Sequence, residues 1–199
     1  QSQSQVHALD FTTWMDNFTF NLFDSSLVGG ATLQRVELSL FGESVSDLTF
    51  NADTDAFVSG TAGSAIFATV SIGGGSLNID VSPDDSFGGV APGVFVAGGT
   101  SLTLPTLTGS DSDMVATVLP ADLTAFTGPG TFDVSLLGLG SLNLTALGGN
   151  VDTIQDTSST GTFSVSYFIE DTPASSVPVR GTLALLGLGL LAMRARKSI

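Results

Sequence analysis

The chain has 199 residues, of which 19 are acidic and five are basic, and its formal net charge at pH 7 is −14. All the acidic residues precede Arg180, and Arg35 is the only Lys or Arg in that stretch. A body with so negative a charge repels phosphate backbones, which excludes nucleic acid as a partner. The absence of cysteine excludes disulfides, thiol catalysis and cysteine metal sites.

The chain begins with a polar stretch, Gln1 to Gln5, that includes neither Met nor an apolar leader. This start indicates either the mature form of an exported protein after signal-peptide removal or a trimmed chain. We predict a polar N-terminal arm over residues 1–17. The single histidine, His7, falls in this arm and is interpreted as a solvated terminal side chain, since a Ser-His-Asp triad needs its histidine ordered in a cleft.

Short segments in which apolar and polar residues alternate follow one another between residues 18 and 170, separated by turns rich in Gly, Pro and Asp. The segments predicted as strands are 18–22, 36–40, 45–50, 66–72, 77–81, 94–97, 102–104, 114–118, 132–136, 142–146 and 163–169. A single helical turn is predicted at 123–126. Trp14 precedes the first of these strands, where it either caps the edge of the core or contacts a partner. The pattern predicts an all-β fold, an antiparallel, jelly-roll-like β-sandwich.

A short polar linker over residues 171–180 leads to an apolar run from Gly181 to Met193 that carries no charge. Leucine covers every face of a helix built from this run, at Leu183, Leu185, Leu186, Leu188, Leu190 and Leu191. A helix that is apolar all round must be buried in protein or in lipid. The run is shorter than the roughly 20 residues of a clean membrane span, so a soluble core helix is the alternative.

A basic cluster, Arg194, Arg196 and Lys197, follows the apolar run directly, and Arg180 precedes it. Such side chains can extend to the headgroups and relieve a short span, and a basic end is typical of the cytoplasmic side. We therefore predict a transmembrane anchor helix with a basic cytoplasmic end over residues 181–199. The preceding domain is then exported and lies in the periplasm or at the cell surface of a bacterium.

The tail resembles a known sorting signal, the PEP-CTERM segment of bacterial surface proteins. The resemblance is carried by Val177-Pro178 and by Gly181-Thr182-Leu183-Ala184-Leu185-Leu186-Gly187-Leu188, followed by the basic end. In that family a Val-Pro-Glu-Pro motif precedes the helix, whereas Val179-Arg180 replace the Glu-Pro here. The resemblance implies either processing by the family's membrane transpeptidase, exosortase, or a tail that stays as a permanent anchor.

The body also resembles a bacterial surface family, the choice-of-anchor E domain. Its opening is matched by Phe23-Asp24-Ser25-Ser26-Leu27 and the following Val36-Glu37-Leu38-Ser39-Leu40. Later landmarks are matched by residues 121–131 and 161–167, so the resemblance covers roughly residues 18–170. It implies a surface location and an anchored domain, and it implies no enzyme activity.

Motifs that carry catalytic chemistry are missing from the chain: we find no H-E-x-x-H, P-loop or dinucleotide fingerprint. No pair among the acids is marked out as a glycosidase pair. The aromatic residues are mostly Phe, which favours core packing over a carbohydrate platform. We therefore predict a non-catalytic structural protein at the surface or in the matrix, in contact with the lipid bilayer or extracellular polysaccharide.

Two alternatives remain open. The chain could be a structural accessory subunit of a larger membrane complex, in which Ala184, Gly187 and Gly189 offer small surfaces for contact with other transmembrane helices. A carbohydrate-active enzyme is the third interpretation, although no site for it is identified.

Asn51, Asp53 and Asp55 place oxygen ligands at alternate positions, as the start of a calcium loop does. The Gly and the distant Glu of an EF-hand loop are missing, and acids that keep a surface turn soluble are the other interpretation. Calcium is the one cofactor that the sequence suggests.

The calcium hypothesis predicts that millimolar Ca²⁺ raises the melting temperature and that a chelator lowers it, because a ligand of the native state stabilises it. Thermal unfolding followed by circular dichroism measures this. A melting temperature that neither addition changes would exclude the hypothesis.

Overall fold

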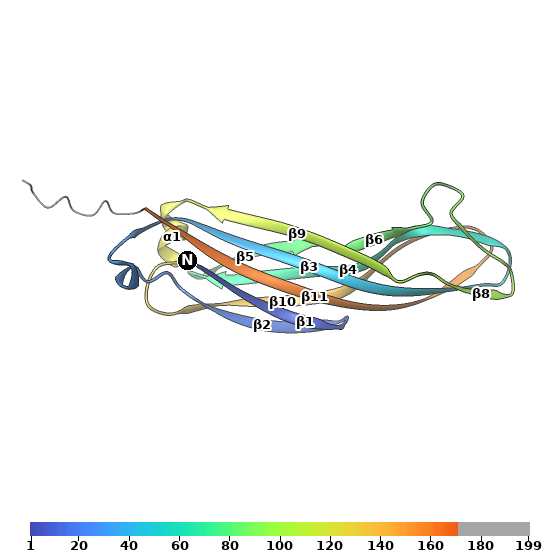
Figure 1. The fold of residues 1–199 in the computed structure, drawn as a ribbon, viewed down its shortest axis with the longest axis horizontal. Coiled ribbons are helices and arrows are strands. Elements are labelled where there is room, and N and C mark those ends of the chain that lie inside the picture. The colour runs from blue at the N-terminus through green and yellow to red at the C-terminus, as the bar shows by residue number, and fades with distance from the viewer. Residues whose placement is uncertain (171–199) are drawn as a thin grey trace, which may run out of the picture.

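Four long antiparallel strands run along most of the molecule and determine its rod-like shape (Figure 1). The computed structural model describes residues 1–170. The long strands are β3 (Thr32–Ala52), β4 (Ala56–Ile72), β10 (Thr131–Gly148) and β11 (Val151–Glu170). β3 pairs with β11 in one sheet, and β4 pairs with β10 in the other, over almost their whole lengths.

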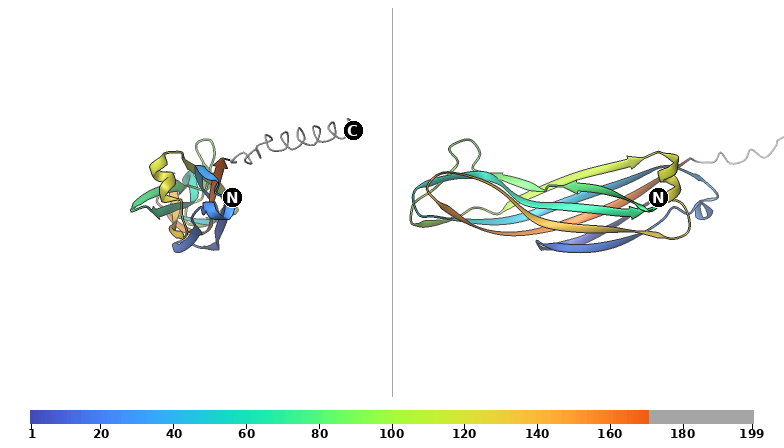
Figure 2. Two further views of the ribbon diagram at one scale, coloured as in Figure 1. Left: turned by 90° about the vertical axis from the view of Figure 1, so that its left-hand side faces the viewer. Right: turned by 180° about the vertical axis from the view of Figure 1, so that it is seen from behind.

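Shorter strands complete a five-stranded and a six-stranded sheet. In the first sheet the neighbours of β11 and β3 are β1 (Ser2–Phe11), β8 (Thr100–Thr103) and β9 (Leu107–Thr117). In the second sheet the neighbours of β10 and β4 are β2 (Trp14–Asn21), β5 (Gly75–Val81), β6 (Asp84–Phe87) and β7 (Val94–Val96). The two layers face each other in the views of Figure 2, which confirms the predicted all-β antiparallel sandwich.

Two short helices, η1 (Ser25–Val28) and α1 (Pro120–Ala125), lie at one end of the rod, which we call the α1 end (Figure 1). The predicted helical turn at 123–126 overlaps α1. The turns between β3 and β4 and between β10 and β11 lie at the opposite end, the far end. The predicted linker over 171–180 and the predicted transmembrane helix over 181–199 lie outside the described residues. Within residues 1–170 the helices are too short or too polar to cross a membrane.

The interior consists of two separate apolar clusters. The larger cluster fills the α1 end and includes Phe20, Leu136 and Phe163, whose side chains have almost no exposed surface. The smaller cluster fills the far end and is made of Leu48, Phe50, Ala52, Ala56, Val58, Ala62, Phe87 and Val96. Burial of both clusters holds the two sheets together, since each sheet contributes apolar side chains to each cluster.

Small and polar residues separate the two clusters, and we call this belt the waist. On the inner face of β3 it includes Gly42, Ser44 and Ser46, which pair with Gly161, Ser159 and Thr157 of β11. Large side chains of the other sheet fill the space over these small residues: a Cβ atom added at Gly42 would lie 2.7 Å from Ile66 Cδ1. A side chain larger than hydrogen is therefore excluded at Gly42.

Hydrogen bonds between side chains satisfy several of the buried hydroxyls in the waist. Ser46 Oγ and Thr157 Oγ1 are 2.8 Å apart, and Trp14 Nε1 donates to Ser159 Oγ at 2.9 Å. Burying a polar group lowers the stability of the fold unless the group is hydrogen-bonded. These bonds therefore allow a belt of polar side chains to lie between the two apolar clusters.

Two sequence-based predictions of separate strands are wrong at the waist. The segments 36–40 and 45–50, expected to be separated at Gly42, are parts of the single strand β3. The segments 132–136 and 142–146 likewise belong to β10. Apolar alternation weakens in the waist while strand pairing continues through it, so the pattern marks the two cores and not the ends of strands.

The prediction of a polar arm over residues 1–17 is wrong, because β1 pairs with β11 from Ser2 to Phe11 and β2 begins at Trp14. The inner face of β1 carries Gln3, Gln5 and His7. These side chains form hydrogen bonds with residues at the edge of β2 and do not enter the core. Gln3 donates to Asn21 O and accepts from Asn21 N, each at 2.9 Å, so its amide substitutes for a neighbouring strand. Polar side chains thus cover the β2 edge, where a strand partner is missing.

Trp14 lies against Gly138 of the neighbouring strand, and the structure confirms that it caps the core edge: it is 6% exposed. A Cβ atom at Gly138 would lie 2.3 Å from Trp14 Cε2, so Gly138→Ala must displace a buried ring. We expect this substitution to lower the free energy of unfolding by about 1–3 kcal/mol. Urea denaturation followed by circular dichroism measures the change.

Gly75→Ala is the matched control, because the nearest atom to the added Cβ is Ile72 O at 3.7 Å. We expect its free energy of unfolding to stay within about 0.5 kcal/mol of wild type. Equal effects of the two substitutions would contradict the close packing of Trp14 on Gly138.

Candidate functional site

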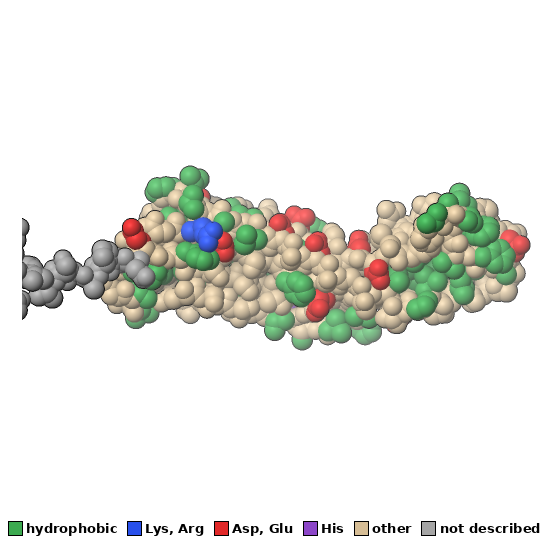
Figure 3. Space-filling model, turned by 45° about the horizontal axis from the view of Figure 1, so that its top comes forward, with side chains coloured by type: hydrophobic (Ala, Val, Ile, Leu, Met, Phe, Trp, Pro, Cys, Tyr) green, Lys and Arg blue, Asp and Glu red, His purple; other side chains and the backbone are tan. Residues whose placement is uncertain are grey.

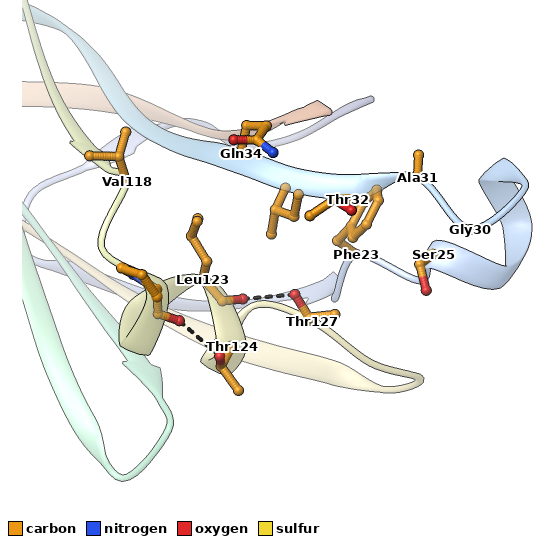
Figure 4. Close-up of a pocket in the computed structure, with 12 residues that line it drawn as sticks. Phe23, Ser25, Gly30, Ala31, Thr32, Gln34, Val118, Leu123, Thr124 and Thr127 are labelled. Atoms are coloured by element: carbon orange, nitrogen blue, oxygen red, sulfur yellow. Dashed lines mark hydrogen bonds between the residues drawn. The ribbon is translucent and has the colours of Figure 1, made fainter. Parts of the chain in front are cut away.

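A pocket of about 630 Å³ opens at the α1 end, between α1 and the first residues of β3 (Figure 4). Its walls come from four parts of the chain: η1 with the residues on either side of it, β3, the segment after β9, and α1 with the turn that follows it. The lining residues are Phe23, Ser25, Gly30, Ala31, Thr32, Leu33, Gln34, Val118, Pro120, Leu123, Thr124 and Thr127.

Backbone hydrogen bonds hold α1 against the segment that leaves β2. Phe23 N donates to Phe126 O, and Gly128 N donates to Phe23 O, both at 2.9 Å. The Phe126 ring is fully buried and packs edge-on against Phe132 at 5.5 Å between centroids. Phe126, directly after α1, thus closes the larger core, while Leu123 faces the pocket.

The chemistry of the pocket wall is apolar with a few hydroxyls and one amide. Thr124 Oγ1 donates to Pro120 O at 2.8 Å, and Thr127 Oγ1 donates to Leu123 O at 2.7 Å, so both hydroxyls bond within the helical turn (Figure 4). The residues that line the pocket include no ionisable side chain. This arrangement suits contact with apolar groups and supplies neither an acid nor a base.

Apolar side chains continue from the pocket onto the outer surface of the α1 end. Leu27 is 79% exposed, Val118 is 61% exposed and Leu119 is 62% exposed. Pro120 is also exposed and follows Leu119 at the start of α1. We call Leu27, Val118, Leu119 and Pro120 the apolar rim; the sequence patterns did not single it out, because loop residues carry no periodic signal.

The far end carries a second exposed apolar surface, visible in the space-filling view (Figure 3). The register places Leu147 of β10 beside Phe57 of β4, and Phe57 beside Phe95 of β7. The Phe57 and Phe95 rings are 5.3 Å apart, and Val90 in the adjoining loop is 91% exposed. We call Phe57, Val90, Phe95 and Leu147 the far-end patch.

The structure places Asn51, Asp53 and Asp55, the predicted calcium ligands, around the turn between β3 and β4 at the far end. The Asn51 side-chain oxygen accepts from Ser101 Oγ, and Asp55 Oδ1 accepts from Gly98 N at 2.9 Å. Within residues 1–170, no cluster of three or more His, Cys, Asp or Glu is placed to hold a metal ion. Calcium binding here stays a prediction.

Another acidic pair comes together only in the tertiary structure. Asp84 begins β6, and Asp111 lies on β9 of the other sheet. Burial raises the pKa of Asp84, and the negative charge of Asp111 raises it further. Among the described residues, Asp84 Oδ1 is buried without a hydrogen-bond partner.

His7 is ordered, contrary to the prediction of a solvated terminal side chain. Its ring stacks on Trp14 at 3.9 Å between centroids, and its Nδ1 lies 2.9 Å from Asp16 Oδ2. A carboxylate only accepts, so Nδ1 is the donor. The histidine therefore packs over the core edge and joins β1 to β2.

No family model and no curated protein matches the chain. It is similar to one solved structure of infectious bursal disease virus Gx strain, with 14% identity and a TM-score of 0.17, covering 100% of this chain and 51% of that one. It is also similar to the Salmonella SPI-1 type III secretion injectisome secretin InvG, with 8% identity and a TM-score of 0.19, covering 94% and 92% of the two chains. The chain thus spans about half the length of the viral chain. Likenesses at these scores do not bear on function.

The hydrogen bond from His7 lowers the pKa of Asp16. A carboxyl with a lowered folded-state pKa contributes stability above its unfolded pKa of about 3.9 and loses it as the pH falls through the folded value. Asp16→Asn should therefore lower the free energy of unfolding at pH 7, by less than about 1 kcal/mol because the pair is partly exposed. Urea denaturation between pH 7 and 2 should show the difference from wild type persisting to about pH 4 and disappearing below it.

A His7→Phe background provides the control, because phenylalanine keeps an aromatic ring beside Trp14 but has no donor to Asp16. In that background Asp16→Asn should have a smaller effect at pH 7. An effect of the same size in both backgrounds would show that His7 is not responsible for the stabilising role of Asp16.

Proposed function

We propose that this chain is a non-catalytic, membrane-anchored β-sandwich protein with a structural role outside the cytoplasm, at a bacterial surface or in its matrix. The observation that carries the proposal is the place where the sandwich ends. β11 finishes at Glu170, at the α1 end, and the following sequence is a polar linker, an apolar run and a basic cluster. A domain of this shape would project from the membrane as a rod.

The length of the rod supports a spacing or display role. β11 has 20 residues, and at about 3.3 Å per residue it spans about 65 Å. The far-end patch would therefore be held well away from the anchor. Acidic side chains are scattered over the intervening face (Figure 3), which suits a solvated stalk that anionic headgroups repel and that therefore stands away from the membrane surface.

The pocket at the α1 end supports a binding or packing role over catalysis. Its lining side chains offer neither a nucleophile beside a base nor a pair of carboxylates. His7, the one histidine of the chain, has its Nδ1 bonded to Asp16 and its ring stacked on Trp14. These contacts favour a structural role for His7 over a role in acid–base chemistry.

A second candidate function, the accessory subunit of a larger membrane complex, is favoured by the far-end patch. Exposed aromatic and aliphatic side chains on neighbouring strands are typical of protein interaction surfaces. In such a complex, the tail helix would pack against other transmembrane helices through Ala184, Gly187 and Gly189.

Membrane fractionation tests the proposal. The full chain should stay in the membrane pellet after alkaline carbonate extraction, because the run 181–193 would lie in lipid. Leu186→Arg combined with Leu188→Arg should move the protein to the soluble fraction, since charge at the centre of a span is costly. Ser176→Arg is the control, because it adds charge outside the apolar run and should leave the protein in the pellet.

Release of the wild-type chain by carbonate would overturn the proposal. The intact mass of the membrane-bound protein then separates the two anchoring schemes: a mass that ends before Gly181 indicates processing, and a mass through Ile199 indicates a permanent anchor. Co-purification of the full chain with other membrane proteins in mild detergent would favour the accessory-subunit function.

A further inference from the structure

We propose that the α1 end is a membrane-contact surface, whose apolar rim enters the interface of the bilayer in which the tail is anchored. This inference rests on the proposed function, because it takes the tail as the anchor. It adds that the sandwich itself binds lipid, at residues far from the tail in the sequence.

The first argument is the position at which the chain leaves the sandwich. Glu170 pairs with Thr32 at the start of β3, and Gln34 Nε2 donates to Glu170 Oε2 at 3.1 Å. Thr32 and Gln34 both line the pocket. The last described residue therefore lies beside the pocket, at the α1 end.

The second argument is the length of the linker. Ten residues, 171–180, separate Glu170 from the apolar run, and a fully extended chain of that length spans at most about 35 Å. The rod is about 65 Å long, so the tether keeps the α1 end nearer to the bilayer than the far end when the rod stands upright. The α1 end is thus the part of the sandwich within reach of the bilayer.

The third argument is the chemistry of the rim. Leu27 belongs to η1, whereas Val118, Leu119 and Pro120 lead into α1, and both elements contribute to the pocket. Exposed Leu and Val side chains gathered at one end would gain free energy by leaving water for the headgroup–acyl boundary, where interfacial helices bury their apolar faces by about 5–10 Å. Apolar side chains therefore lie on two sides of the pocket, so the rim is a surface made of several residues.

The charges at the α1 end determine which lipid headgroups it can approach. Three acidic side chains at this end are hydrogen-bonded to uncharged groups only: Asp24 accepts from Ser26 N and Ser26 Oγ, Asp122 accepts from Thr117 Oγ1, and Glu170 accepts from Gln34. Arg35, the only Lys or Arg among residues 1–170, pairs with Glu37 at 2.9 Å. The end is therefore net negative, and it fits zwitterionic headgroups in preference to anionic ones.

Quenching of tryptophan fluorescence by brominated lipid tests the inference in the full chain. Leu119→Trp places a reporter on the rim, and Val90→Trp places the matched reporter at the far end, where the native side chain is 91% exposed. Both proteins are reconstituted into phosphatidylcholine nanodiscs with and without bromine on the acyl chains. The wild-type protein gives the contribution of Trp14, which is 6% exposed.

Brominated lipid should reduce the fluorescence of the Leu119→Trp reporter by about twofold or more, because the rim would lie within the reach of the acyl chains. The Val90→Trp reporter should change little. Equal quenching of the two reporters would overturn the inference, and so would an unquenched Leu119→Trp reporter in a protein that remains bound to the nanodisc. An unquenched but blue-shifted reporter would assign the rim to another occupant, such as the segment Val177-Pro178-Val179 of the chain itself.

Failure of the proposed function gives a different result from failure of this inference. If the tail is not an anchor, Leu186→Arg combined with Leu188→Arg does not change the fraction of the chain that co-elutes with nanodiscs. If the tail is an anchor but the α1 end does not touch lipid, the chain co-elutes and the rim reporter behaves like the reporter at the far end.

Discussion

The continuity of four long strands through a narrow waist is the constraint on which the rest of this structure depends. β3 pairs with β11 and β4 with β10 on both sides of the waist, so the two cores belong to one rod. Neighbouring side chains leave no room for a Cβ atom at Gly42, which meets Ile66, or at Gly138, which meets Trp14. Serine and threonine near them bond to one another or to Trp14, which keeps a polar belt inside a folded domain without a large desolvation cost.

This construction separates the two ends of the molecule. One end holds η1, α1, the pocket and the last residue of β11, and the other holds the turns between the long strands together with the far-end patch. Each end exposes apolar side chains, and the faces between them carry scattered acidic side chains together with exposed apolar ones such as Leu9, Phe11 and Met15. A rod with two different apolar ends is suited to connect two environments, which is the physical basis of the role that we propose.

The parts of the fold that were predictable are those where alternation is uninterrupted. The segment 163–169 lies within β11, and its inward residues Phe163, Val165 and Tyr167 are buried. The first residues were misjudged because the inner face of β1 is polar: Gln3, Gln5 and His7 meet the edge of a neighbouring strand and not a core. The pocket was not predicted either, because its walls come from segments that are far apart in the sequence.

The sequence by itself determined the all-β class, the negative charge of the body and the apolar character of the tail, because alternation, charge and hydropathy are local properties of the chain. Only the tertiary structure decided that separate apolar segments join into single long strands, that His7 stacks on Trp14, and that Glu170 ends beside the pocket. These features depend on which strand edges and loop residues meet in space, and such meetings leave no periodic signal in the order of the residues.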